Sequence, residues 1–136
     1  MERIYLDSCI VIYLVERHPL YEPLLRERLK GLEEAQLAVS PLVRLEVLVH
    51  PLRDGNEDLA QLYRLFLDEQ LMLDMPEDVY DAALTLRVFH TLKTPDALHL
   101  ATAQYHGCSQ FWTNDDRLAT VAGELALNIL AAEQPQ

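Results

Sequence analysis

Short apolar runs that alternate with helical segments constrain the fold of this 136-residue chain more than any other feature. Each run is followed by a stretch in which apolar residues recur at helical spacing. Strands separated by helices form a parallel sheet that is covered on both faces, so we expect one three-layer α/β domain. The expected strands are Arg3–Leu6, Gln36–Val39, Leu71–Leu73, Gln110–Trp112 and Leu127–Leu130.

The helical segments carry start and stop signals. Ser40-Pro41 and Thr94-Pro95 each match an N-cap followed by proline at the first helical position. The first of these helices is expected to end near His50, because Pro51 has no N–H to donate, and Gly107 is expected to close the second. The other helices are expected over Cys9–Val15, Tyr21–Leu32, a segment capped by Asn56 or Asp54, Pro76–Phe89, and a short segment from near Asp115.

No linker or repeat divides the chain, so we expect a single domain over residues 1–132 and a polar tail at 133–136. Half of the residues are hydrophobic, which is enough for a core without covalent staples. Cys9 and Cys108 have no disulfide or zinc spacing and are predicted to be small core residues. Without a signal-peptide pattern or a membrane-length apolar run, the chain is predicted to be cytoplasmic, with no membrane partner.

Four carboxylates lie where strands end or helices begin, which is where an open parallel sheet gathers functional groups. Asp7 ends the first strand, Glu46 lies about one and a half turns into the helix after Pro41, and Asp96 lies in the first turn of the helix after Pro95. Asp115 lies two residues past the fourth strand. If the first and fourth strands are neighbours, all four can face one cleft.

An all-carboxylate cleft suits Mg²⁺ or Mn²⁺, which prefer oxygen ligands. Such an ion can lower the pKa of a bound water and polarise a phosphoryl oxygen. Simpler interpretations remain open: Asp7 and Asp96 as helix-capping or dipole-compensating residues, and Asp115 as part of a solvated turn. Glu46 is harder to explain in this way, because its helix is apolar on most sides and burial of an unpaired acid is costly.

The four acid-bearing segments resemble the signature blocks of PIN-domain ribonucleases and, more narrowly, VapC toxins of prokaryotic toxin–antitoxin pairs. The resemblance covers nearly the whole chain, in the family's order. The segments are Tyr5–Ser8, Ser40–Glu46, Thr94–Ala103 and Trp112–Asp115.

The resemblance implies a five-stranded parallel sheet in the order 3-2-1-4-5 and RNA cleavage that depends on Mg²⁺ or Mn²⁺. Asp7, Asp96 and Asp115 match direct or water-mediated metal ligands, and Glu46 matches an acid that contacts the metal through water or assists proton transfer. Asp116 is an extra acid that could replace Asp115. Supporting roles are implied for Ser8 and Thr113, whereas His99 is expected to be a packed or capping residue.

Basic residues near the acids are candidates for contact with RNA phosphates, since arginine and lysine suit that role. Solvated ion pairs are the simpler interpretation of each. The candidates are Lys93, which precedes the Thr94-Pro95-Asp96 turn, and Arg44, Arg87 and Arg117.

The formal net charge of −11 opposes RNA binding but favours a basic protein partner. The family implies a cognate antitoxin whose basic tail can enter the acidic cleft. The leucine-rich segments Ile10–Leu14, Leu24–Leu32 and Leu59–Phe66 could form a groove for the antitoxin or the face of a homodimer.

Three alternatives remain at this stage. The chain could be a PIN nuclease of RNA processing, which its genomic neighbourhood would separate from a toxin. A catalytically silent PIN-like binding module is a second, and the presence of all four acids argues against it. A phosphotransfer enzyme of the DxDx(T/V) kind is the third, and it is disfavoured because Cys9 stands two residues after Asp7.

Overall fold

The five strands of the computed structural model form one parallel sheet in the order β3-β2-β1-β4-β5, which confirms the expected order. The structure describes residues 2–123 and 126–128. The strands are β1 Arg3–Leu6, β2 Gln36–Val39, β3 Leu71–Met72, β4 Gln110–Thr113 and β5 Ala126–Asn128. The rest of the expected last strand and the predicted tail at 133–136 lie outside the described residues.

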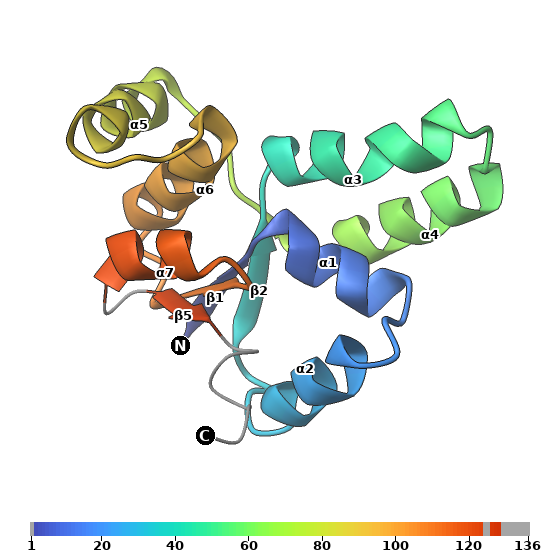
Figure 1. Ribbon diagram of the computed structural model, residues 1–136. Coiled ribbons are helices and arrows are strands. Elements are labelled where there is room, and N and C mark those ends of the chain that lie inside the picture. The colour runs from blue at the N-terminus through green and yellow to red at the C-terminus, as the bar shows by residue number, and fades with distance from the viewer. Residues whose placement is uncertain (1, 124–125, 129–136) are drawn as a thin grey trace.

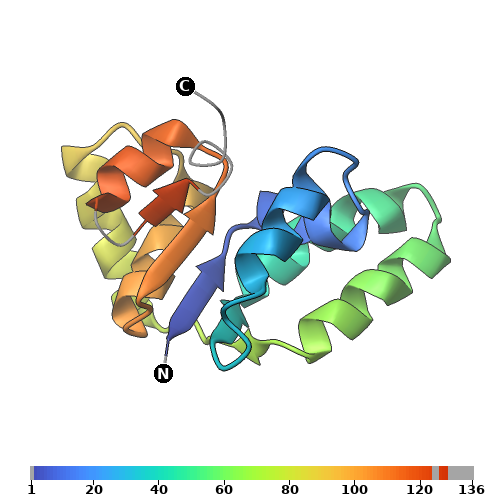
Figure 2. The same cartoon turned by 90° about the horizontal axis from the view of Figure 1, so that it is seen from below.

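The helices lie in two groups on either side of the strands. Figures 1 and 2 show α1 to α4 on one side of β1, and α5 to α7 on the other. Their bounds are α1 Ser8–Val15, α2 Tyr21–Leu29, α3 Pro41–Arg53, α4 Glu57–Asp68, α5 Glu77–Phe89, α6 Thr94–Tyr105 and α7 Asp116–Ala122. The predicted three-layer α/β class is therefore confirmed. No helix in the described part of the chain is long and apolar enough to cross a membrane.

Three predicted helix boundaries are wrong in detail. The helix expected over Tyr21–Leu32 ends at Leu29. Pro51 lies inside α3 and does not stop it, because the last turn is closed by hydrogen bonds from residues further on, with the Asp54 N–H donating to the His50 carbonyl. Thr94 is the first residue of α6 and not its cap, and its hydroxyl accepts a hydrogen bond from Arg87. The Ser40 cap is confirmed, since its hydroxyl accepts from the Val43 N–H, and Asn56 caps α4.

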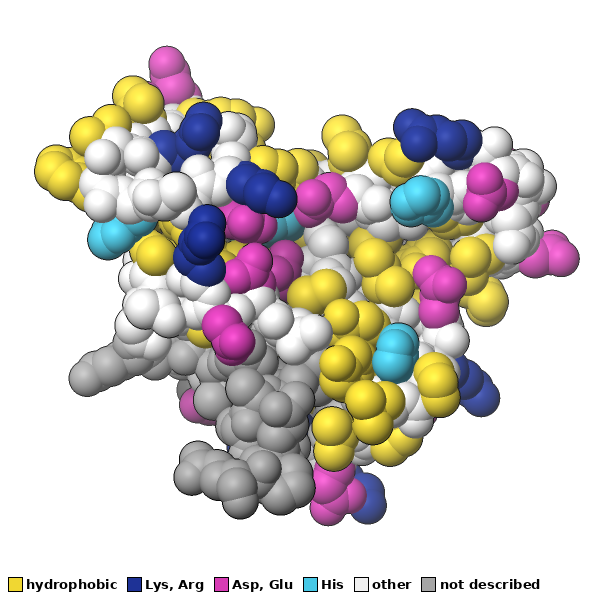
Figure 3. Space-filling view, in the orientation of Figure 1, with side chains coloured by type: hydrophobic (Ala, Val, Ile, Leu, Met, Phe, Trp, Pro, Cys, Tyr) yellow, Lys and Arg dark blue, Asp and Glu magenta, His cyan; other side chains and the backbone are white. Residues whose placement is uncertain are grey.

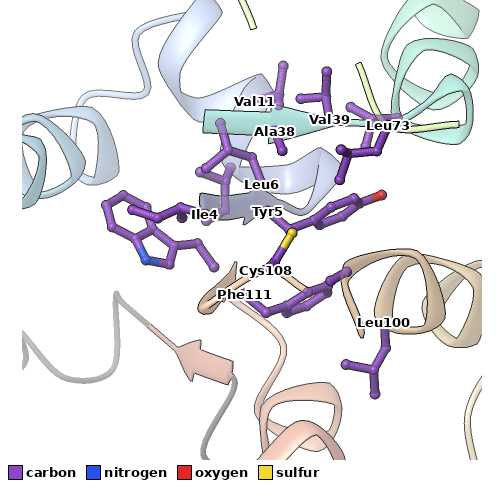
Figure 4. Packing of buried hydrophobic residues seen from close by; sticks show 14 of the residues in the cluster. Ile4, Tyr5, Leu6, Val11, Ala38, Val39, Leu73, Leu100, Cys108 and Phe111 are labelled. Carbon is purple, nitrogen blue, oxygen red and sulfur yellow. The ribbon is translucent and has the colours of Figure 1, made fainter. Parts of the chain in front are cut away.

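The core lies along the central strands. Ile4, Tyr5 and Leu6 of β1 are fully buried, and the Tyr5 ring stacks on Phe111 of β4 with ring centroids 5.3 Å apart (Figure 4). Cys108 is buried as predicted, whereas Cys9 is only partly buried. Burial of β1 on all sides fixes the position of its last residue and hence of Asp7, which follows it.

Register then brings the ends of β1 and β4 together. Leu6 pairs with Trp112, and the Asp7 N–H donates to the Trp112 carbonyl at 3.0 Å. Asp7, which follows β1, and Thr113, the last residue of β4, therefore lie side by side at the carboxyl edge of the sheet.

Candidate active site

The four predicted acids line one open cleft of about 550 Å³. Figure 3 shows acidic side chains gathered below the notch between α6 and α3, with basic side chains on the side of α5 to α7. The expected convergence of Asp7, Glu46, Asp96 and Asp115 is therefore found. The cleft is completed by Ser8, Cys9, Tyr13, His99, Asn114 and Asp116.

Asp7 is the most firmly held of the acids. Its side chain is nearly buried, and Oδ1 accepts a hydrogen bond from the Ser8 N–H at 2.8 Å, so the residue also caps α1. Its Oδ2 accepts from the Thr113 hydroxyl at 2.8 Å. The same hydroxyl oxygen accepts from the Asp115 N–H at 3.0 Å, so Thr113 links two of the predicted acids.

Glu46 reaches the cleft from the second turn of α3. Its Oε1 accepts hydrogen bonds from the Ser8 hydroxyl at 2.7 Å and from His99 Nε2 at 2.5 Å. Burial of the carboxylate opposes its ionisation, but the hydrogen bond and charge of His99 and the hydrogen bond of Ser8 outweigh burial and lower the pKa of Glu46. Glu46 is therefore a paired acid.

Asp96 has the opposite environment. Burial, together with the negative charges of Asp7 and Asp115, raises the pKa of this carboxyl group. Within the described part of the chain, no group donates a hydrogen bond to its oxygens. Its position in the first turn of α6 fits the dipole interpretation, yet the net effect of its surroundings disfavours its charge.

Asp115 caps α7, since its Oδ1 accepts from the Leu118 N–H at 3.1 Å. The residue is exposed at the rim of the cleft, beside Asp116. Both acids also line a neighbouring hollow of about 360 Å³, together with Thr91, Lys93, Asp96 and Arg117.

The four basic residues predicted to contact phosphate lie in three different surroundings. Lys93 and Arg117 are exposed and line the hollow that also contains Asp96 and Asp115. Arg44 is exposed and lines neither the cleft nor this hollow. Arg87 holds the loop before α6, donating to the Leu92 carbonyl and the Thr94 hydroxyl.

His99 is packed, as expected, but its hydrogen-bonded contacts were not predicted from the sequence. This side chain is only 1% exposed, and it lies between Glu46 and Tyr5, with Nδ1 2.7 Å from the Tyr5 hydroxyl. A signal was available: α6 is buried from Ala97 to Ala103, and a buried imidazole in such a helix needs polar partners.

Cys9 was predicted as a core residue, but it lines the cleft, with its Sγ 3.8 Å from Asp7 Oδ2. Burial, together with the negative charge of Asp7, raises the pKa of this thiol to about 12. These surroundings favour the protonated thiol at neutral pH.

A family model for the PIN domain matches residues 4–124. The chain belongs to the PIN-domain family. It is 35% identical to Ribonuclease VapC46 of Mycobacterium tuberculosis (strain ATCC 25618 / H37Rv), over 96% of this chain and 98% of the relative, and is VapC-like within the family.

Two solved structures share this PIN fold. One is a toxin–antitoxin complex from Klebsiella pneumoniae, with a TM-score of 0.75 and 24% identity over 93% of this chain and 97% of that one. The other is VapC20 of Mycobacterium tuberculosis, described as a toxin that cleaves the sarcin-ricin loop, with a TM-score of 0.70 and 16% identity over 86% and 93%.

Proposed function

We propose that this chain is a Mg²⁺- or Mn²⁺-dependent endoribonuclease that hydrolyses RNA phosphodiester bonds and serves as the toxin of a toxin–antitoxin pair. One observation carries the proposal. In a PIN-domain chain with a VapC relative, carboxylates from four separate segments line a single cleft at the carboxyl ends of β1 and β4.

The donor chemistry of the cleft fits a hard divalent cation. The raised pKa of Asp96 reflects burial and, after it, the negative charge of neighbouring acids, and a bound cation would offset that charge. As placed, no three acidic, His or Cys side chains of the described residues are close enough together to hold a metal ion. Mg²⁺ keeps several waters and takes only one or two carboxylates directly. Acids that are too far apart to bind it directly can therefore still hold it through its water ligands.

We assign the residue roles from these surroundings. Asp7, Asp96 and Asp115 would hold the cation directly or through water, and Thr113 would keep Asp7 and Asp115 in register across the two strands. Glu46 would contact the cation through water or assist proton transfer at the attacking water. A bound cation would supply charge for the phosphoryl oxygens and an attacking water of lowered pKa.

RNA would approach over the hollow that contains Lys93 and Arg117. Their positive charges offset the acids at the rim, and phosphates bind to such side chains with a strong dependence on salt. Arg44 has no comparable place in the site, so its predicted phosphate contact is the least supported.

A protein partner is supported by the solved toxin–antitoxin complex and by a groove of about 640 Å³ between α1, α2 and α4. Its apolar lining is Leu14, Val15, Leu59, Leu62 and Phe66. Four of these come from the predicted segments Ile10–Leu14 and Leu59–Phe66, whereas Leu24–Leu32 contributes only Arg26. We propose that an apolar segment of the antitoxin binds there, and that its basic residues complement the net charge of −11. The homodimer and the cytoplasmic location stay predictions.

Cleavage of a panel of tRNA and other structured RNAs by the purified protein tests the function. The panel would be run with Mg²⁺, with Mn²⁺ and with EDTA, and repeated with Asp7→Asn and Asp96→Asn. We expect cleavage that requires the metal and is lost in both variants. Asp81→Asn is a matched control, because it removes the same charge from an exposed position on α5 that lines neither hollow.

Absence of cleavage from folded, antitoxin-free protein with either metal would contradict the proposal and favour a silent binding module. Cleavage without an antitoxin gene beside the coding sequence would instead favour a nuclease of RNA processing.

A further inference from the structure

Five side chains from separate elements form a continuous hydrogen-bonded chain behind the cleft. The Ser40 hydroxyl lies 2.8 Å from the Tyr5 hydroxyl, which lies 2.7 Å from His99 Nδ1. His99 Nε2 then contacts Glu46 Oε1 at 2.5 Å, and the Ser8 hydroxyl contacts the same oxygen at 2.7 Å. Tyr5 and Ser40 are fully buried and His99 is 1% exposed, so the contacts among these three side chains are shielded from water, whereas the two contacts to Glu46 are partly buried.

The direction of the chain follows from the donors available. Ser40 Oγ accepts from the Val43 N–H, and its own proton can be donated to the Tyr5 hydroxyl. Tyr5 can then donate to His99 Nδ1, and a proton on Nε2 is directed at the Glu46 carboxylate, which can only accept when ionised. Nε2 carries this proton in the Nε2–H tautomer of the neutral imidazole and also in the charged form, so either form can donate to Glu46, although Tyr5 donates to Nδ1 only in the neutral one.

Both donors to Glu46 meet the same oxygen. Oε1 is occupied by His99 and Ser8, whereas none of the described residues donates to Oε2. His99 Nε2 also lies 3.8 Å from Asp7 Oδ1, so the imidazole stands between two of the cleft acids. A His99 that only filled space in α6 would not require its ring to bridge a core tyrosine and a half-exposed acid on another helix.

We infer that His99, anchored by Tyr5, is a positioning residue that fixes the Glu46 carboxylate so that only Oε2 is presented to the cation or the water in the cleft. This inference rests on the proposed function for its catalytic consequence, but not for its geometry. Hydrogen-bonded partners of acids that act at a metal typically change metal affinity or activity by about 10–100-fold when removed.

Three variants test the inference. His99→Leu removes the donor, His99→Gln places an amide N–H near the position of Nε2, and Tyr5→Phe removes only the anchor. We expect His99→Leu to lower kcat for RNA cleavage by about 10–100-fold with KM within about twofold, His99→Gln to recover most of kcat, and Tyr5→Phe to lie between them. His106→Leu is the matched control, since His106 contacts Asp74 and lines neither hollow.

Two readouts are independent of cleavage. We expect Mn²⁺ binding by calorimetry to weaken by about tenfold in His99→Leu and to recover in His99→Gln. By ¹⁵N NMR we expect a proton on His99 Nε2 that exchanges slowly with water and shifts in Tyr5→Phe and in Glu46→Ala. If His99→Leu does not fold, the comparison of His99→Gln with Tyr5→Phe and the NMR signal carry the test.

Wild-type kcat and Mn²⁺ affinity in a folded His99→Leu protein would overturn the inference, as would an Nε2 without a protected proton. Failure of His99→Gln to improve on His99→Leu would also overturn it. If the wild-type protein cleaves no RNA, the proposed function fails, and the Mn²⁺ and NMR results still decide whether His99 positions Glu46.

Discussion

The two halves of the acidic cleft are built differently. On the half formed by β1 and α3, Asp7 and Glu46 accept hydrogen bonds from Ser8, Thr113 and His99. On the half formed by the starts of α6 and α7, Asp96 receives none from the described residues, and Asp115 is exposed and accepts from the backbone of its own helix.

As a consequence, ionisation of the carboxyl group is favoured at Glu46 and disfavoured at Asp96. Hydrogen bonds from the protein lower the pKa of Glu46, whereas burial and neighbouring acids raise that of Asp96. In the half formed by β1 and α3, the carboxylates are held by hydrogen bonds even without a metal ion. In the half formed by the starts of α6 and α7, a bound cation would stabilise the ionised carboxylates most. The comparison therefore predicts that the two halves respond differently to the same neutralising substitutions.

The largest expected effect is on cleavage. Asp7→Asn and Asp96→Asn should each lower kcat/KM for RNA by about a thousandfold or more, because loss of a metal-binding carboxylate removes several kcal/mol of transition-state stabilisation. Asparagine is a good N-cap, so Asp7→Asn keeps the cap of α1. Single-turnover assays at saturating Mg²⁺ measure this, and retention of activity in either variant would remove that half from the site.

Thr113→Val should have the second-largest effect on cleavage, because it keeps the shape of the side chain and removes the hydroxyl that links Asp7 to the Asp115 N–H. We expect a loss of about 10–100-fold in cleavage and of about 1–3 kcal/mol in the free energy of unfolding. Thr102→Val is the matched control: it removes a buried hydroxyl that donates to the Leu98 carbonyl, so it should cost stability but not activity. Equal activity losses in the two variants would mean that Thr113 acts only through folding.

A smaller effect is expected at the rim. Lys93→Gln should raise KM several-fold and make the salt dependence of RNA binding shallower, by a slope of about 0.7 if one phosphate contact is lost. Arg44→Gln removes the same charge outside both hollows and should change KM less. Binding titrations over a range of salt concentrations measure both, and a larger effect at Arg44 would place the RNA path over α3.

The smallest effect is on the stability of the metal-free protein. Asp96 is destabilising once ionised, so its cost appears as pH rises through its raised pKa, and Asp96→Asn should raise Tm near neutral pH. Glu46 contributes stability above its ordinary pKa that is lost as pH falls through its lowered pKa, so Glu46→Gln should lower Tm at neutral pH. Both groups are partly exposed, so each shift should be no more than about 4 °C.

Melting curves between pH 3 and 7 measure the difference, which should shrink as the pH falls. Shifts of the same sign in the two variants would contradict the division of the cleft.

The fold was readable from the sequence because its signals are local. Apolar runs and proline-marked helix starts placed the strands and most helices within a few residues, and the positions of the four acids after strands or near helix starts followed. The strand order came from the family resemblance and not from spacing. Pro51 could not be read correctly, because whether a proline ends a helix depends on hydrogen bonds made by the residues beyond it.

The candidate site was readable only in part, for a physical reason. Carboxylates at strand ends reveal themselves by position, but the partners that decide their charge come from packing. Tyr5 looks like a core residue of β1 and His99 like a residue of an apolar helix, and only the tertiary structure joins them to Glu46. The orientation of Thr113 between two acids also depends on the register of β1 with β4.

Calorimetric titration of Mn²⁺ into the wild-type protein, Asp7→Asn, Asp96→Asn and the control Asp81→Asn tests the central claim most directly. The account predicts saturable binding by the wild-type protein and by Asp81→Asn, with affinity at least about tenfold weaker in both cleft variants. Equal affinity in all four proteins, or no saturable binding by the wild-type protein, would contradict a shared cation site formed by the two halves of the cleft.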